Sequence, residues 1–331
     1  MILLTGGTGL LGTHTLLALA RKNIAVVAIK RPASDLQTFY YLAEKAGVNL
    51  KHITWFDADL LDVNAIYEVT KNINTVIHCG AFVSFAPKQQ LLMHKINTDG
   101  TANIINACLA NNVNRFIHVS SVATLGDGIG AITEENHWIT SAYHSQYAIS
   151  KYGAEREAWR GMAEGMQVVV INPTVILGEG YWNKNGGALI KYAASEKCFY
   201  PKGSTGFIDV VDVVNVILFL LENEINGTRF IINGHNTTYK NILDQTAQLF
   251  NKKAPALAAN YFTTHAAWRL QSIFSILTGT QPLLTKETAI SSLSNRLYSN
   301  TKMRNSIDVA ITPLAETLKR ICNCYTAMNQ H

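Results

Sequence analysis

Short runs of β-branched and other apolar residues alternate with longer amphipathic stretches through the first two-thirds of the chain. Such alternation is typical of parallel strands joined by crossover helices. The predicted strands are Ile2–Thr5, Ala25–Lys30, Leu50–Phe56, Thr75–His78, Arg115–Ser120 and Gln167–Asn172, and the predicted helices are Leu10–Arg21, Leu36–Ala46, Val63–Thr70, Lys88–Ala110 and Gln146–Ala163. The pattern predicts an α/β fold with a doubly wound parallel sheet, in which ligands bind at the carboxyl ends of the strands.

The rhythm changes after about residue 173. Gly178, Gly180, Gly186 and Gly187 indicate loops, Val210–Glu222 and Tyr239–Phe250 indicate helices, and Arg229–Asn233 indicates a strand. From Thr263 onward the chain is predicted to be mostly helical. We expect a first domain over residues 1–173, to which segments around 205–235 return, and a smaller, mostly helical lobe over residues 174–331.

Composition agrees with a well-packed enzyme of two lobes. The 331 residues are 48% hydrophobic and 15% charged, and a chain of this length exceeds the size of one hydrophobic core. The net charge of +5 comes from scattered Lys and Arg, which fits an anionic small molecule and gives no reason to expect a nucleic-acid partner. The first strand directly follows Met1, so we expect no signal peptide, no membrane span and a cytoplasmic location. The five cysteines show no paired spacing, and we expect reduced, mostly buried thiols and no metal site.

The candidate cofactor turn is Thr5-Gly6-Gly7-Thr8-Gly9-Leu10-Leu11-Gly12, which follows an apolar strand and opens an amphipathic helix. Gly6 and Gly9 allow a tight turn close to a pyrophosphate, and Gly12 allows the helix to pack close to the strand. The free N–H groups of the helix then face the phosphates. An ordinary tight strand–helix turn is the alternative.

Two cations, Lys30 and Arg31, stand at the end of the second strand, where NAD-preferring enzymes place an acidic residue. A guanidinium at this position would bind the 2′-phosphate of NADP, whereas a carboxylate would repel it. Solvated loop residues are the alternative. The sequence favours NADP, with NAD still possible.

Tyr147 and Lys151 are four residues apart in a predicted helix, so their side chains share one face. Ser121 ends the fifth predicted strand, 26 residues before Tyr147. An ammonium near the phenol is expected to lower the pKa of Tyr147 and to make it an acid or base, while Ser121 orients the substrate oxygen and Lys151 holds the nicotinamide ribose. An exposed helical pair and a capping serine are the alternative.

With Asp57-Ala-Asp59-Leu60-Leu61-Asp62, Val76-Ile-His78-Cys-Gly80-Ala81 and Asn97-Thr-Asp-Gly100-Thr101, these motifs resemble the extended short-chain dehydrogenase/reductase family over about residues 1–235. Arg31-Pro-Ala-Ser-Asp35 and Ile171-Asn-Pro173-Thr-Val-Ile-Leu-Gly178 are most similar to its dihydroflavonol-reductase and 3β-hydroxysteroid-dehydrogenase-like branch. The resemblance implies an NAD(P)-binding Rossmann domain and a Ser121–Tyr147–Lys151 triad. It also implies Asp59 and Leu60 near the adenine, Gly80 and Ala81 along the cofactor, Pro173 beside the nicotinamide, and a homodimer formed through Lys88–Ala110 and Gln146–Ala163.

Two departures from the family's patterns narrow the activity. Flavonoid reductases carry an asparagine where this chain has Gly126, and nucleotide-sugar enzymes carry an arginine where this chain has Gly203-Ser-Thr205-Gly206. We therefore expect an NADPH-dependent reductase of a small or hydrophobic carbonyl compound, or a dehydrogenase of the matching alcohol. A sugar epimerase or dehydratase with tightly bound NAD is the second hypothesis. A non-catalytic NADP-sensing or scaffold protein is the third, which the intact triad disfavours.

Several other residues keep two interpretations. Phe82, Phe85, Tyr143 and His144 line an apolar substrate pocket or cover a core. His78 is more readily a buried histidine satisfied by the backbone than a catalytic one. Asn97 joins the hydrogen bonds of the cofactor site or caps a helical turn. The amphipathic stretch 266–277 is a lid or core helix, with a membrane face as the alternative.

Overall fold

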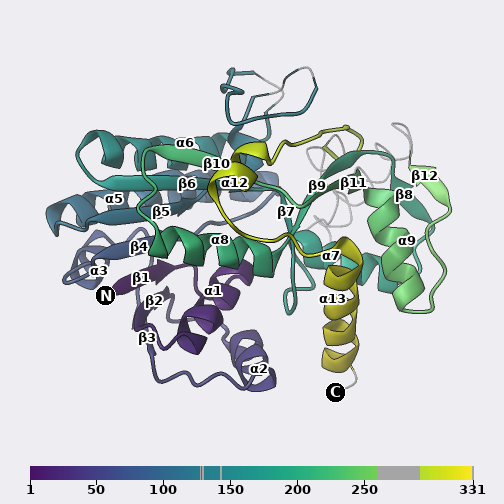
Figure 1. The fold of residues 1–331 in the computed structure, drawn as a ribbon, viewed down its shortest axis with the longest axis horizontal. Coiled ribbons are helices and arrows are strands. Elements are labelled where there is room, and N and C mark those ends of the chain that lie inside the picture. The colour runs from purple at the N-terminus through teal and green to yellow at the C-terminus, as the bar shows by residue number, and fades with distance from the viewer. Residues whose placement is uncertain (127, 129, 142–143, 260–290, 330–331) are drawn as a thin grey trace.

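The computed structural model describes residues 1–126, 128, 130–141, 144–259 and 291–329 (Figure 1). Seven parallel strands form the main sheet in the order β10-β6-β5-β4-β1-β2-β3. They are β1 (Ile2–Thr5), β2 (Val26–Lys30), β3 (Ile53–Asp57), β4 (Thr75–His78), β5 (Arg115–Val119), β6 (Gln167–Pro173) and β10 (Thr228–Ile232). This order confirms the predicted doubly wound, Rossmann-like sheet, with β10 added beside β6 at its edge.

Helices cover both faces of the sheet, and each face has its own hydrophobic core. One core contains α1 (Leu10–Arg21), α2 (Gln37–Lys45) and α8 (Val210–Glu222); the other contains α3 (Val63–Val69), α5 (Gly100–Ala110) and α6 (Gln146–Ala163). Successive strand residues alternate between them, so that Leu3 packs under α3, α5 and α6, and Leu4 packs under α1, α2 and α8. Burial on both faces explains why the strands are continuous apolar runs in the sequence.

The predicted continuous helix Lys88–Ala110 is wrong in its middle. The segment starts with the 3-10 turn η1 (Pro87–Gln89) and α4 (Gln90–His94), widens into a π-turn η2 (Lys95–Asp99), and becomes regular only in α5. The π-turn places Asn97, 1% exposed, where its amide binds both backbone groups of Phe82. Bulges of this kind are frequent at functional sites.

A second, smaller layer lies beside the main sheet. It has a sheet of β7 (Val175–Leu177), β9 (Ser204–Asp209) and β11 (His235–Thr238), a two-stranded sheet of β8 (Phe199–Pro201) and β12 (Leu257–Ala259), and the helices α7 (Asn185–Ala194), α9 (Tyr239–Leu249), α12 (Thr301–Ser306) and α13 (Leu314–Met328). The sequence analysis predicted none of these short strands, of which the longest, β9, has six residues.

The prediction that Gly186 and Gly187 mark a loop is also wrong, because both lie in the first turn of α7. A Cβ added at Gly186 would lie 2.3 Å from the Ile176 oxygen, and one at Gly187 would lie 2.2 Å from the Tyr181 oxygen. These glycines therefore allow the helix to contact neighbouring backbone closely.

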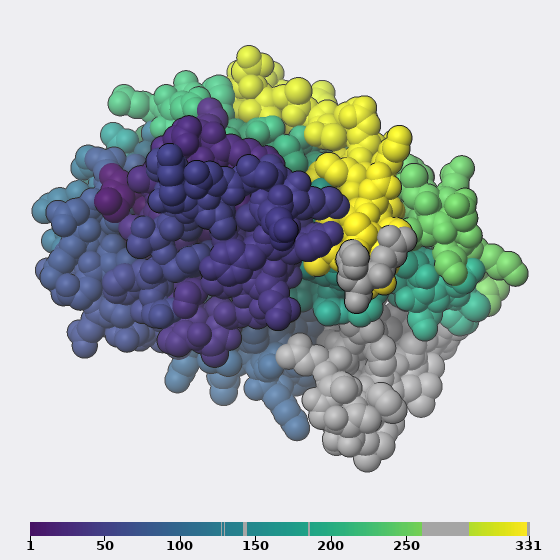
Figure 2. Space-filling view, turned by 90° about the horizontal axis from the view of Figure 1, so that it is seen from below, coloured from purple at the N-terminus to yellow at the C-terminus, as the bar shows by residue number. Residues whose placement is uncertain are grey.

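The C-terminal helix α13 joins the two layers. Its Cys324 packs in the core under α1, while Leu318 and Ile321 pack in the core of the smaller layer. Figure 2 shows this segment, in yellow, between the purple N-terminal part and the green lobe. Arg320 pairs with Asp209 and Glu179 on the facing segments. Residues 260–290, including the amphipathic stretch 266–277, lie outside the described residues.

No helix in the described part of the chain is long and apolar enough to cross a membrane.

Candidate active site

Residues 6–12 form the turn after β1 and the first residues of α1, and the absence of side chains at its glycines shapes it; we call this segment the glycine turn. Gly6 has φ +72°, and a Cβ there would lie 2.7 Å from the backbone of Cys79 and Gly80 at the end of β4. A Cβ at Gly12 would lie 2.1 Å from the Gly6 oxygen. These two glycines are required by the fold of the turn itself, and Gly12 acts within the turn, where we had expected it to act between helix and strand.

The N-terminus of α1 carries donors that the helix does not use. Gly9 is the N-cap residue and offers no side-chain cap, and the first helical hydrogen bond runs from Thr13 N to Gly9 O at 2.9 Å. The N–H groups of Leu10, Leu11 and Gly12 therefore precede the intrahelical pattern. Thr8 lies between Gly7 and Gly9 and is half-buried. A turn without Cβ atoms beside free N–H groups fits the pyrophosphate of a dinucleotide.

The ends of β2 and β3 separate the two predicted cations. Lys30 forms an ion pair with Asp57 on the neighbouring strand, so its charge is already matched. Arg31 is exposed, and its backbone N–H donates to Ser34 Oγ at 3.1 Å. Among the described residues, no hydrogen bond or ion pair engages the Arg31 guanidinium. Of the two residues proposed for a 2′-phosphate, only Arg31 therefore has an uncommitted charge.

Leu60 and the loop after β4 lie together beside the glycine turn. A Cβ added at Gly80 would lie 3.1 Å from Leu60 Cδ1, and the Gly80 N–H donates to Thr5 Oγ1 at 3.0 Å. Asp59, half-buried, accepts the N–H of Leu61 at 2.9 Å. Ala81, which follows Gly80, is exposed. The structure thus brings Leu60 and Gly80 to the carboxyl ends of the strands, beside Gly6.

His78 is a structural residue that links the glycine turn to the π-turn. Its Nδ1 lies 2.8 Å from Thr5 Oγ1, and its Nε2 lies 3.1 Å from Thr101 Oγ1. The Thr101 hydroxyl donates to the backbone oxygen of Asn97 at 2.5 Å. Burial lowers the pKa of His78 to about 3, so the ring is neutral. We expected the backbone to satisfy this ring, but two threonine hydroxyls satisfy it. Asn97, in turn, holds Phe82 and contacts Ser150 of α6 at 2.9 Å.

The proposed catalytic side chains meet at the carboxyl end of β5. The Ser145 hydroxyl caps α6 by accepting the Ala148 N–H at 3.1 Å, and this places Tyr147 in the first turn and Lys151 one turn later. The Tyr147 hydroxyl lies close enough to the Ser121 side chain for the two to interact. Lys151, 3% exposed, donates from Nζ to the Val119 oxygen at 2.8 Å. Ser121, Tyr147 and Lys151 are therefore adjacent in space.

The electrostatics of this cluster differ from the sequence-based expectation for Tyr147. Burial raises the pKa of Tyr147, against a smaller lowering by the hydrogen bond with Ser121. For Lys151, burial lowers the pKa to about 8, opposed by the charge of Glu155. The expectation of a lowered Tyr147 pKa is wrong because the Lys151 ammonium is directed at the Val119 carbonyl. At neutral pH the phenol is protonated and the ammonium is charged.

The remaining predicted residues lie at different distances from the catalytic cluster. The Phe85 ring lies 6.0 Å from the Tyr147 ring, centroid to centroid. Pro173 is the last residue of β6, where it is buried and paired with β10. His144 is turned to other partners: its Nε2 lies 2.7 Å from the Ile139 oxygen, and its ring stacks on Trp138 at 3.9 Å. Tyr143 lies outside the described residues.

Comparison with known proteins identifies the family of the chain. The family model of the NAD-dependent epimerase/dehydratase family matches residues 2–233, well over half of the chain. The chain belongs to this family. As a member, it is an NAD(P)-dependent oxidoreductase of the extended short-chain dehydrogenase/reductase type, as the sequence predicted.

Its curated relatives include both reductases and epimerases. The chain is 26% identical over 260 residues to the sterol demethylase protein B of Methylococcus capsulatus, covering 77% of this chain and 76% of the relative. It is 26% identical to the UDP-glucose 4-epimerase of Vibrio cholerae, covering 76% of each chain. It is 25% identical to a putative dihydroflavonol 4-reductase of Synechocystis sp., covering 76% of this chain and 73% of the relative. These relatives support the family and the enzyme class but leave reductase and epimerase undistinguished.

The fold is shared with solved structures. The UDP-glucose 4-epimerase structure of Thermotoga maritima superposes with a TM-score of 0.79 at 16% identity, covering 99% of both chains. At this identity the likeness shows the fold alone.

Sequence reasoning missed a set of buried polar residues behind the catalytic cluster. They are Glu155, Asn172 and Arg229. Glu155 could have been found, because it lies four residues after Lys151 and eight after Tyr147, on the same helix face. Arg229 could not, because no local spacing links it to α6.

Proposed function

We propose that this enzyme is an NADPH-dependent reductase of a small or hydrophobic carbonyl compound. The observation that carries this proposal is the pairing of Tyr147 with Ser121: burial raises the pKa of Tyr147, so the phenol keeps its proton at neutral pH. A protonated phenol is suited to donate to a carbonyl oxygen that becomes an alcohol. When bound, the nicotinamide supplies the hydride.

The other side chains bind and orient. The glycine turn with Leu10 and Leu11 would hold the pyrophosphate, Asp59 and Leu60 the adenine end, and Gly80, Ala81 and Pro173 the length of the dinucleotide. The buried Lys151 ammonium would hold the nicotinamide ribose, and Ser121 would orient the substrate oxygen. Phe82 and Phe85 would line an apolar substrate pocket, with His144 and Tyr143 on the same segment as Tyr147.

Arg31 supports the choice of NADP. Its side chain is exposed at the end of β2, whereas Lys30 is paired with Asp57. A guanidinium binds a phosphate through charge-assisted, often bidentate hydrogen bonds.

The domain organisation and assembly belong to the same proposal. Residues 1–173, with the returning strand β10, would bind the cofactor, and residues 174–331 would mainly bind substrate. α5 and α6 lie side by side, joined by Arg160 and Asn106 at 2.7 Å, and would pair with the same helices of a second copy in a homodimer.

An epimerase or dehydratase with tightly held NAD is the alternative, supported by the relative from Vibrio cholerae. The two activities differ in their use of cofactor. A reductase consumes NADPH in a one-to-one ratio with a carbonyl substrate, whereas an epimerase retains its NAD and turns over without net redox change.

The test is NADPH oxidation across a panel of aldehydes and ketones. We expect Tyr147→Phe to lower kcat by about 10²- to 10⁴-fold, because the proton donor is lost. Tyr152→Phe, on the same helix with its ring stacked on Trp138, is the matched control and should retain activity. Full turnover by Tyr147→Phe would overturn the assignment of the acid.

A further inference from the structure

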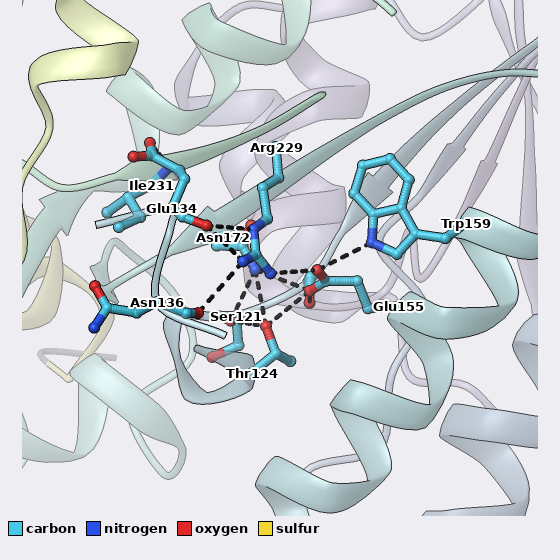
Figure 3. A network of polar contacts seen from close by, with 10 residues as sticks. Ser121, Thr124, Glu134, Asn136, Glu155, Trp159, Asn172, Arg229 and Ile231 are labelled. Atoms are coloured by element: carbon cyan, nitrogen blue, oxygen red, sulfur yellow. Dashed lines mark hydrogen bonds and ion pairs between the residues drawn. The ribbon is translucent and has the colours of Figure 1, made fainter. Parts of the chain in front are cut away.

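Glu155 lies one helical turn beyond Lys151 and is 2% exposed. Its Oε2 accepts hydrogen bonds from Ser120 Oγ at 2.5 Å, Thr124 Oγ1 at 2.8 Å and Asn172 Nδ2 at 3.0 Å (Figure 3). Its Oε1 accepts from Trp159 Nε1 at 3.3 Å and pairs with Arg229 Nη1 at 3.4 Å. A buried carboxylate is costly unless it is paired and hydrogen-bonded, and Glu155 satisfies both conditions.

Three of these donors surround Ser121. Ser120 precedes it, Thr124 follows three residues later in η3 (Val122–Thr124), and Asn172 Nδ2 also donates to the backbone oxygen of Ser121 at 3.0 Å. The Thr124 hydroxyl lies within reach of both the Glu155 carboxylate and the backbone oxygen of Ser121, but it has a single proton. Because a charge-assisted hydrogen bond is the stronger one, Thr124 donates to Glu155, and Asn172 donates to the backbone oxygen of Ser121. Glu155 thereby holds both ends of the turn that carries Ser121.

Arg229 supplies the balancing cation from a distant part of the chain. It lies on β10, the edge strand of the main sheet, and its Nε and Nη2 donate to the backbone oxygen of Glu134 at 3.0 and 2.5 Å. The Glu134 carboxylate accepts the Ile231 N–H at 2.8 Å. Arg229 is therefore fixed between β10 and the segment that leads into α6 (Figure 3).

The same carboxylate acts on Lys151. Burial lowers the pKa of the Lys151 ammonium, and the electrostatic interaction with Glu155 and, to a smaller extent, with Cys79 opposes that lowering. The titratable groups that interact electrostatically with Lys151 are Glu155 on the same helix, Cys79 after β4, His78 on β4 and His118 on β5. Both histidines are buried with lowered pKa values and stay neutral, and burial raises the Cys79 pKa to about 12. Glu155 is thus the group of this set that most strongly opposes the lowering of the Lys151 pKa.

We propose that Glu155 is a positioning residue for the reaction: it holds the Ser120–Thr124 turn against Tyr147 and supplies the negative charge behind Lys151, while Arg229 balances its charge. This inference rests on the proposed roles of Ser121, Tyr147 and Lys151. It assigns to Glu155 no contact with substrate or cofactor.

Glu155→Gln tests the proposal, with Glu157→Gln as the matched control. Glu157 lies on the same helix but pairs with Arg160 near the surface. The first measurement is the pKa of Lys151 in protein without added cofactor, from NMR of lysines labelled with ¹³C at Cε and assigned with Lys151→Met. We expect a lower Lys151 pKa in Glu155→Gln than in wild type, and an unchanged one in Glu157→Gln.

The second measurement separates kcat from KM. We expect Glu155→Gln to lower kcat by about 10- to 100-fold with little change in KM, because a misplaced Ser121 affects the transition state more than binding. Should Glu155→Gln not fold, Ser120→Ala, which removes one neutral donor, replaces it with an expected loss of about 3- to 10-fold in kcat.

Two outcomes would overturn the proposal: a folded Glu155→Gln protein with wild-type kcat and Lys151 pKa, or an unchanged kcat in Ser120→Ala where Glu155→Gln cannot be folded. Failure of the proposed function looks different. Wild-type protein would then oxidise no NADPH with any carbonyl, while the NMR comparison of the Lys151 pKa would still decide the role of Glu155.

Discussion

The glycine turn and the cluster around Glu155 lie at the same edge of the sheet, yet they are built in opposite ways. In the glycine turn, backbone approaches backbone, and Gly6 and Gly12 leave no space for a Cβ. Around Glu155, buried side chains from α6, η3, β6 and β10 satisfy one carboxylate. The first site depends on atoms that are absent, and the second depends on charges that are paired.

Glycine substitutions should produce the largest effect and separate packing from cofactor approach. Gly12→Ala forces a Cβ to within 2.1 Å of the Gly6 oxygen, so we expect a loss of about 3 kcal/mol in the free energy of unfolding. At Gly9 the added Cβ would lie 3.4 Å from that oxygen, an ordinary contact, so Gly9→Ala should fold normally. We expect it to weaken NADPH binding by about tenfold, or about 1.4 kcal/mol. Denaturant titration and fluorescence titration with NADPH measure the two effects. Equal stability of the two variants would contradict this account of the turn.

Arg31 differs from the glycine turn because its proposed role in binding the cofactor belongs to an exposed side chain. Arg31→Asp should shift the ratio of NADPH to NADH affinity by about 10- to 100-fold toward NADH, as expected when charge-assisted hydrogen bonds of about 1.5–3 kcal/mol are lost. Lys51→Asp, an equal charge change at an exposed turn before β3, is the control. An unchanged preference in Arg31→Asp would refute the proposed 2′-phosphate site.

The titration of Lys151 should change the activity and the stability of the protein in opposite directions as pH rises. Above pH 8, which is about the pKa of buried Lys151, the ammonium loses its proton, and we expect kcat/KM to fall as pH rises. The free energy of unfolding should move the other way. Because the unfolded chain keeps its lysine protonated to higher pH, it binds more protons than the folded chain, and the Lys151 contribution to stability rises with pH above 8.

Lys151→Met provides the check on that pH dependence, since it should abolish the stability increase. A pH–rate profile and denaturation midpoints across the alkaline range provide the data. Parallel falls of activity and stability would show that alkaline inactivation is unfolding and does not report on Lys151.

The same contrast explains what could be predicted from the sequence. The glycine turn, β1 and α6 were predicted at their observed bounds, because their signals lie within short, contiguous segments. Tyr147 and Lys151 were recognised by their helical spacing. The partners of Glu155 come from residues 120, 124, 172 and 229, and only the tertiary fold joins them. The pKa of Tyr147 depends on burial and on the direction of the Lys151 side chain, which no sequence motif encodes.

The return of the chain as β10 has a consequence for synthesis. A nascent chain that has emerged only as far as residue 200 contains the glycine turn, Ser121, Tyr147, Lys151 and Glu155, but it lacks Arg229. Burial of Glu155 without its counter-charge is costly, so the centre should close only once β10 has joined β6. During translation, the glycine turn can form early, whereas the cluster around Glu155 is complete only after β10 has joined the sheet.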